Sequence, residues 1–170
     1  MHRSGTLQVT LPSDREILMT RVFDAPRHLV FEALTRAELL RRWFGGPPGW
    51  RLDVCEIDAR AGGKYRYVWA RDNGEVMGMG GTILECVAPE RLVATETFDQ
   101  AWYEGQGVSS IVLSEENGKT TLRLTVQYDS KEVRDHVLSF PATTGVEMGY
   151  DRLAEWLAGD EAREALAELA

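Results

Sequence analysis

The sequence predicts an α+β fold, with a curved antiparallel sheet wrapped around a long C-terminal helix. Three observations support this prediction. A strand pattern at residues 17–23 runs into two short helical patterns. Six further strand patterns then follow one another, and an amphipathic helical pattern ends near Leu157. Because strands and helices are segregated along the chain instead of alternating, an antiparallel sheet is expected.

The first strand and the two helices after it are separated by a short turn. Ile17–Phe23 has the composition of a strand, and Asp24–Pro26 ends it. Proline suits the start of a helix because its missing N–H has no partner there in any case. Apolar residues at helical spacing follow over residues 27–34, and a second short helix ends near Trp43.

Six strand patterns make up the middle of the chain. They are separated by turn-forming residues such as Asn73-Gly74, a pair that suits a tight hairpin. In the last strand Leu122 and Leu124 alternate with polar residues, which predicts one buried face. The expected strands are Trp50–Ile57, Lys64–Trp69, Met77–Val87, Arg91–Phe98, Val108–Ser114 and Thr121–Tyr128.

The closing helix is expected to begin at residues 139–141, with Ser139 as its N-cap and Pro141 in its first turn. Its inner face is small in the N-terminal half and bulky in the C-terminal half. The residues of this face are Ala142, Val146 and Gly149, followed by Tyr150, Leu153 and Leu157. Small residues under a curved sheet leave space, so this asymmetry predicts an internal cavity.

A chain of 170 residues is most simply one folded domain. We expect an N-terminal arm over residues 1–15, which could add to a sheet edge, and the main domain over residues 16–158. Residues 159–170 form a short amphipathic helical tail. Such a helix is too short to be stable alone, so it docks on the domain, docks on a partner subunit in a homodimer, or frays.

Charge and hydropathy limit the range of partners. The net charge of −8 disfavours nucleic acid, because binding to phosphates needs a basic face. No apolar run reaches the roughly 20 residues of a membrane helix, so no membrane insertion is expected. The N-terminus lacks the apolar core of a signal peptide, which favours the cytoplasm. Cys55 and Cys86 are most simply two reduced thiols, although a disulfide or a metal pair is formally open.

No metal or cofactor site is expected from the motifs. His2, His28 and His136 are scattered, and no spacing of histidine, cysteine and carboxylate residues indicates zinc. The glycine-rich segment Gly78–Gly81 lies inside a strand pattern with no helix after it. A bulge or close backbone packing explains it better than a phosphate loop.

Glu56 and Glu96 are the two candidates for acid–base chemistry, because each interrupts an otherwise apolar strand. A carboxyl group turned inward would have a raised pKa and could act as an acid or a base. At a register shift the same residue would instead lie on the outward face. We favour the outward orientation for both.

Five segments of the chain together resemble the START-like, helix-grip superfamily, which also contains polyketide cyclases and birch-pollen-allergen-like proteins. The segments are Val22–Phe31, Leu40–Phe44, Cys55–Tyr65, Ala88–Val93 and Tyr150–Leu153. Within the superfamily, the chain is most similar to the branch named after the activator of heat-shock-protein ATPase. The likeness extends over nearly the whole chain.

This resemblance implies a deep pocket between the sheet and the long helix, used in the wider superfamily for lipids, sterols and polyketides. We therefore expect a protein that binds a small, mainly apolar molecule. A cyclase- or dehydratase-type enzyme and a stress-response or chaperone-regulating module are the alternatives. The chain also has more aromatic residues than one core cluster needs. The expected ligand-binding residues are Trp43, Phe44, Tyr65, Tyr67, Trp69, Phe98, Val146, Gly149, Tyr150 and Leu153.

Overall fold

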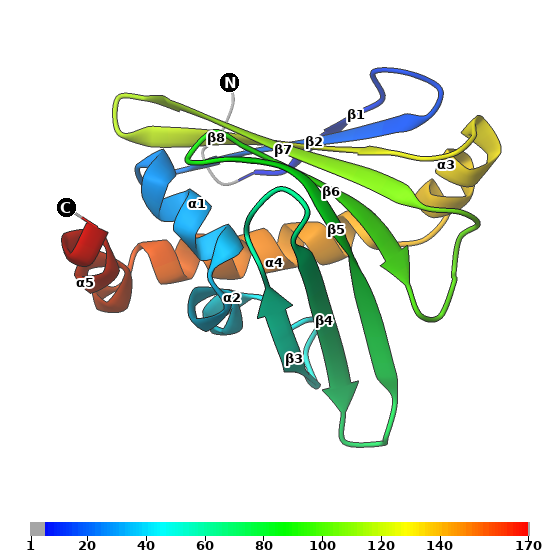
Figure 1. The fold of residues 1–170 in the computed structure, drawn as a ribbon, viewed down its shortest axis with the longest axis horizontal. Coiled ribbons are helices and arrows are strands. Elements are labelled where there is room, and N and C mark those ends of the chain that lie inside the picture. The colour runs from blue at the N-terminus through cyan, green and yellow to red at the C-terminus, as the bar shows by residue number, and fades with distance from the viewer. Residues whose placement is uncertain (1–5, 170) are drawn as a thin grey trace.

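The computed structural model describes residues 6–169, in which eight antiparallel strands form one curved sheet (Figure 1). The order across the sheet is β1-β2-β8-β7-β6-β5-β4-β3. The strands are β1 (Gln8–Thr10), β2 (Glu16–Phe23), β3 (Trp50–Ile57), β4 (Lys64–Arg71), β5 (Val76–Val87), β6 (Arg91–Phe98), β7 (Gly107–Glu116) and β8 (Lys119–Gln127). The six strands predicted for the middle of the chain are confirmed, with ends that differ by at most a few residues.

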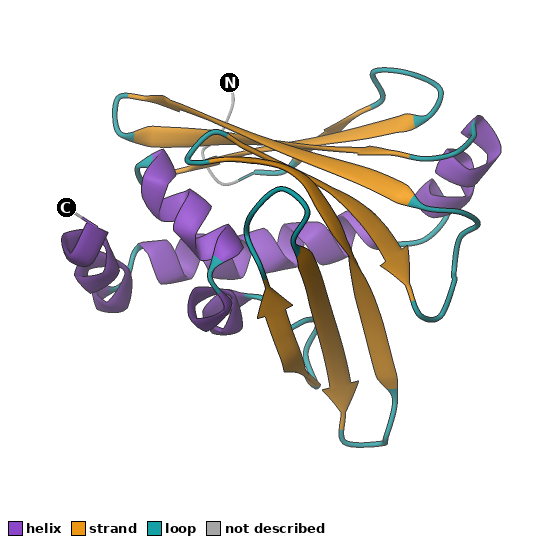
Figure 2. Cartoon of the chain, in the orientation of Figure 1, coloured by secondary structure: helices purple, strands orange, loops and turns teal. Residues whose placement is uncertain are grey.

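Five helices accompany the sheet, and the longest, α4, runs beneath its concave side (Figures 1 and 2). The helices are α1 (Arg27–Thr35), α2 (Ala37–Trp43), α3 (Lys131–Leu138), α4 (Ala142–Leu157) and α5 (Asp160–Leu169). α1, α2 and α5 gather around the C-terminal half of α4, whereas α3 lies at its N-terminal end (Figure 1). The predicted α+β architecture, with a sheet wrapped around a closing helix, is confirmed.

The interior is divided into two hydrophobic clusters. The main cluster packs the C-terminal half of α4 against α1, α2 and the inner faces of β3–β8, with Leu153 and Leu122 fully buried. The second cluster lies near α3 and contains Ile17, Tyr103 and Tyr128 among its buried residues. Since the clusters have separate buried residues, the two halves of α4 face different surroundings.

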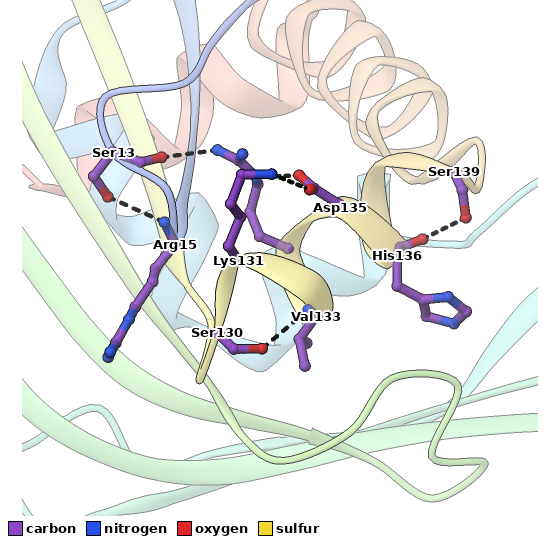
Figure 3. Close-up of polar contacts among 9 residues, drawn as sticks. Ser13, Arg15, Ser130, Lys131, Val133, Asp135, His136 and Ser139 are labelled. Atoms are coloured by element: carbon purple, nitrogen blue, oxygen red, sulfur yellow. Dashed lines mark hydrogen bonds and ion pairs between the residues drawn. The ribbon is translucent and has the colours of Figure 1, made fainter.

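The junction between α3 and α4 differs from the sequence prediction (Figure 3). Ser139 is not the N-cap of the closing helix, because it ends α3 and its hydroxyl donates a hydrogen bond to the carbonyl of His136 over 2.5 Å. The closing helix begins at Ala142 after Pro141, without a side-chain cap. The prediction failed because the short helix α3 precedes this serine. The Ser139 hydroxyl donates to a carbonyl group in the last turn of α3 and does not cap α4.

Helix α3 has the N-cap that the closing helix lacks (Figure 3). The Ser130 hydroxyl accepts a hydrogen bond from the backbone N–H of Val133 over 3.1 Å. Arg134 is buried and donates to the carbonyl of Ser13 over 2.8 Å, which ties α3 to the loop between β1 and β2. α3 is thereby held at the end of the sheet where α4 begins.

Both ends of the described chain are part of the fold. β1 pairs with β2 at the sheet edge, which is the sheet addition considered for the N-terminal arm. α5 docks on its own domain, with Ala162 fully buried in the main cluster and Arg42 paired with Glu161 over 2.7 Å. Of the three arrangements considered for the tail, the structure therefore has the first.

The two cysteines and the hydropathy of the helices agree with the expectations from the sequence. Cys55 and Cys86 are free thiols, as expected, and burial raises the pKa of each. Among residues 6–169, no helix is long and apolar enough to cross a membrane.

Candidate functional site between the sheet and the closing helix

Glu96 faces the interior, in contrast to the outward orientation that we favoured from the sequence. Leu92 and Ala94 are buried in the main cluster, and Phe98 packs against the second. Side chains alternate along a strand, so Glu96 shares their face and points toward α4. The side chain is half-buried. The outward interpretation required a register shift in β6. Its pairing with β7 has none, and the shift in its pairing with β5 places the extra residue on β5, between Ile83 and Glu85.

The Glu96 carboxylate is hydrogen-bonded to a buried tyrosine. The Tyr103 hydroxyl donates to Oε1 of Glu96 over 2.9 Å. Burial raises the pKa of Glu96, because the charged form loses water, and the hydrogen bond from Tyr103 opposes this shift only in part. This carboxyl group therefore has the perturbed pKa that is typical of functional carboxylates, although structural pairs have it too.

Two further tyrosines, Tyr65 and Tyr128, lie close enough to Glu96 for the charge of its carboxylate to raise their pKa values. Burial raises the pKa of Tyr65, Tyr103 and Tyr128, and the neighbouring carboxylate raises each of them further. The Tyr65 hydroxyl donates to the backbone carbonyl of Thr95 over 2.6 Å. The phenols are thus neutral hydrogen-bonding groups under the influence of one carboxylate, and Tyr103 is the one that bonds to it.

The helix opposite these groups has buried residues in its C-terminal half only. The buried residues of α4 are Tyr150, Leu153 and Leu157, whereas none of the residues 142–149 is buried. A Cβ atom added at Gly149 would meet only Trp43, at 3.9 Å. The inner face of the N-terminal half therefore retains accessible surface beside the sheet.

Most of the aromatic residues predicted to bind a ligand pack against one another in the main cluster. Phe44 contacts the rings of Trp43, Tyr67 and Trp69, with ring centroids 5.0–5.3 Å apart. Tyr150 lies 6.1 Å from Trp43, and Tyr65 lies 5.2 Å from Tyr67. These contacts account for the residues as core packing, and ligand contact by any one of them stays a prediction.

The polar atoms of the two indoles in this group are satisfied by the backbone. Nε1 of Trp43 donates to the carbonyl of Ala33 over 2.9 Å, and Nε1 of Trp69 donates to that of Phe44 over 2.8 Å. Buried polar groups need such partners. Both tryptophans are therefore fixed by the fold, with no donor left for a ligand.

Phe98 is separate from that group and belongs with the aromatic residues of the second cluster. Its ring lies 5.5 Å from Trp102 and 5.9 Å from Tyr103. Trp102 in turn contacts Phe140, which is exposed just before α4 begins. Val146 packs against both clusters. Phe98, Val146 and Gly149 are thus the predicted ligand-binding residues that lie nearest to the open half of α4.

Glu56 lies on the other side of the sheet. It is exposed and lines a groove of about 450 Å³ on the outer face, together with Arg66 and Asp99. Arg66 donates two hydrogen bonds to the Asp99 carboxylate, over 2.7 and 2.5 Å. For Glu56 the favoured outward orientation is therefore correct, and this residue does not meet Glu96.

A second hollow, between the end of β2 and the junction of α4 with α5, is lined by Phe23, Leu157 and Arg163 among others. Neither hollow lies between the sheet and the N-terminal half of α4. The enclosed cavity expected from the sequence therefore stays a prediction. Within residues 6–169, no group of three or more histidine, cysteine or carboxylate side chains is placed to hold a metal ion.

Sequence reasoning missed Tyr103, which is not among the residues expected to bind a ligand. Glu96 stands two residues after Ala94 and two before Phe98, so a two-residue strand period places it on the same face as these apolar residues. That spacing could have revealed its inward orientation. The partnership with Tyr103 depends on the loop between β6 and β7, whose path has no local sequence signal.

The sheet wrapped around α4 defines the class: this is a helix-grip protein of the START-like superfamily. The particular family follows from the sequence. The chain belongs to the family described as activator of Hsp90 ATPase homolog 1-like protein, whose model matches residues 24–158. The resemblance inferred from the five segments is thereby confirmed.

Solved structures from several bacteria are similar to this chain. A protein from Rhodobacter sphaeroides is 29% identical, with a TM-score of 0.84 over 90% of this chain and 99% of that chain. One from Chromobacterium violaceum is 26% identical, with a TM-score of 0.71 over 85% and 99%. One from Nitrosomonas europaea, 23% identical with a TM-score of 0.77 over 89% and 99%, shows the fold alone. No curated protein matches the chain.

Proposed function

We propose that this protein binds a small, mainly apolar molecule between the inner face of the sheet and the N-terminal half of α4. The single observation that carries this proposal is the uneven burial of α4, whose buried residues begin at Tyr150, whereas its N-terminal half packs only partly buried side chains against the core. A closing helix that served only to complete the core would bury its inner face along its whole length. START-like proteins typically bind ligands, which also supports the proposal.

The side chains around this space suit an apolar ligand. Ala142 and Val146 on α4 are half-buried, and Phe98 presents a half-buried ring from β6. Covering such surface is favourable by about 25 cal/mol for each Å² removed from water. The outer groove is lined instead by Lys64, Arg66 and Asp99, so an apolar molecule would gain less there.

The experiment is a thermal-shift screen of the purified protein against lipids, sterols and small aromatic compounds, with mass spectrometry of whatever co-purifies. A ligand present at 100 times its Kd should stabilise the fold by about 2.7 kcal/mol. Saturable shifts with apolar compounds are expected. If no compound in a broad panel shifts the melting temperature, the binding function is wrong.

A cyclase- or dehydratase-type enzyme is the second candidate, favoured by the hydrogen bond between Tyr103 and Glu96. A buried carboxyl group with a raised pKa is suited to act as a general acid or base, and a neutral phenol can polarise a carbonyl group. Turnover of a bound compound that is lost in Glu96→Gln, with binding retained, would support the enzyme. Binding without any conversion of the compound would support the first candidate.

A further inference from the structure

The Glu96 carboxylate has capacity to accept more hydrogen bonds than it receives. Within residues 6–169, its one hydrogen bond comes from Tyr103 and reaches Oε1. No lysine or arginine of this part of the chain forms an ion pair with Glu96. A carboxylate has about four acceptor positions on its two oxygens. The half-buried group therefore favours any donor that approaches from the open half of α4.

Among residues 6–169, the interior offers no compensating positive charge at this position. The buried arginine of the inner sheet face, Arg21, is paired with Asp151 over 2.7 Å and lies over the ring of Phe23 in the main cluster. Arg134 is paired with Asp135 and bound to the carbonyl of Ser13. A ligand carboxylate placed near Glu96 would therefore meet a like charge with no cation of residues 6–169 beside it, which is unfavourable at a half-buried position.

We propose that Glu96 selects the ligand: it accepts a hydrogen bond from a hydroxyl or amine group at one end of an otherwise apolar molecule, and it excludes carboxylic acids. This inference rests on the proposed binding function and names the chemistry of its ligand. Tyr103 holds the carboxylate in place through Oε1, so that Oε2 is left for the ligand. The apolar part then lies along Phe98 and Val146.

The test uses three naphthalene probes of nearly equal size. 2-Naphthol carries a donor, 2-methoxynaphthalene has an acceptor only, and 2-naphthoate is an anion. Dissociation constants are measured by calorimetry near neutral pH for the wild-type protein, Glu96→Gln and Tyr103→Phe. Glu56→Gln is the matched control, because the same change there removes an exposed carboxylate on the outer face.

The wild-type protein should bind 2-naphthol about tenfold or more tightly than 2-methoxynaphthalene, since hydrogen bonds to charged groups are among the stronger ones. It should bind 2-naphthoate most weakly. In Glu96→Gln the preference for 2-naphthol should shrink and 2-naphthoate should gain affinity. Glu56→Gln should match the wild-type protein, and Tyr103→Phe should keep the order of the three probes because Glu96 remains.

The outcomes separate this inference from the function on which it rests. Equal binding of all three probes, or a preference that survives in Glu96→Gln, would leave the binding function standing and overturn the role of Glu96. Loss of the preference in Tyr103→Phe alone would assign selection to the phenol and also overturn it. Absence of binding by every probe and by the wider panel would refute the binding function, and this inference with it.

Discussion

Gly107 on β7 lies directly opposite Glu96 on β6, and its missing side chain makes room for the carboxylate and its tyrosine partner. A Cβ atom added at Gly107 would lie 3.1 Å from the Tyr103 hydroxyl and 3.6 Å from Oε1 of Glu96. It would also lie 3.3 Å from a methyl group of Val126. The hydrogen-bonded pair therefore depends on a glycine in the neighbouring strand.

Gly107→Val should break this arrangement. The added methyl groups overpack a buried position, which typically costs about 1–3 kcal/mol of the free energy of unfolding. Urea denaturation measures that loss, and binding of 2-naphthol should weaken in the variant that remains folded. A variant as stable as the wild-type protein, with unchanged binding, would show that the pocket around Glu96 is looser than described.

Glu96→Gln should change how stability depends on pH. Burial raises the pKa of Glu96 in the folded state, so the folded protein binds more protons than the unfolded chain between the ordinary glutamate value and the raised one. Stability of the wild-type protein should therefore fall as the pH rises through that interval. The glutamine variant lacks this fall, and it can still accept the hydrogen bond from Tyr103.

The measurement is urea denaturation of both proteins at several pH values, with Glu56→Gln as the exposed control. The variant should gain stability over the wild-type protein as the pH rises, and the difference should vanish in acid, where Glu96 is protonated in both states. A constant difference at every pH would mean that the carboxylate is well solvated.

Gly149→Leu tests the open half of α4. A Cβ atom at this position meets only Trp43, at ordinary van der Waals distance, so the variant should fold with little loss of stability. Its side chain should occupy ligand space and raise the Kd for 2-naphthol. Gly145→Leu is the matched control, because Gly145 is exposed on the same helix with no atom of the described chain within 4 Å of an added Cβ.

A folded Gly149→Leu that binds 2-naphthol normally would place this residue away from the ligand. A loss of about 1–3 kcal/mol would mean instead that the helix is tightly packed there. Circular dichroism and calorimetry on both leucine variants distinguish these results.

The fold could be predicted from the sequence because its signals are local. Alternation in the strand ending at Tyr128 and helical spacing after Pro26 each follow from a few neighbouring residues. The error at Ser139 had a local cause too, since two helices compete for one serine. A cap is assigned correctly only when the end of the preceding helix is known.

The candidate site could be predicted only in part. The small inner face of the closing helix was visible in the sequence, and Glu96 was recognised as unusual. Its partner Tyr103 lies seven residues away, on the loop between β6 and β7, and strand pairing places Gly107 opposite Glu96. Such contacts between residues are set by tertiary structure, and spacing along the chain does not reveal them.

The most direct test of the account is to locate a bound probe by nuclear magnetic resonance, titrating 2-naphthol into isotope-labelled protein. Saturable shifts are expected for backbone amides of residues 142–149 on α4 and of Glu96 and Phe98 on β6. Shifts confined to the outer groove around Arg66 and Asp99, or no saturable shift at all, would contradict binding between the sheet and the closing helix.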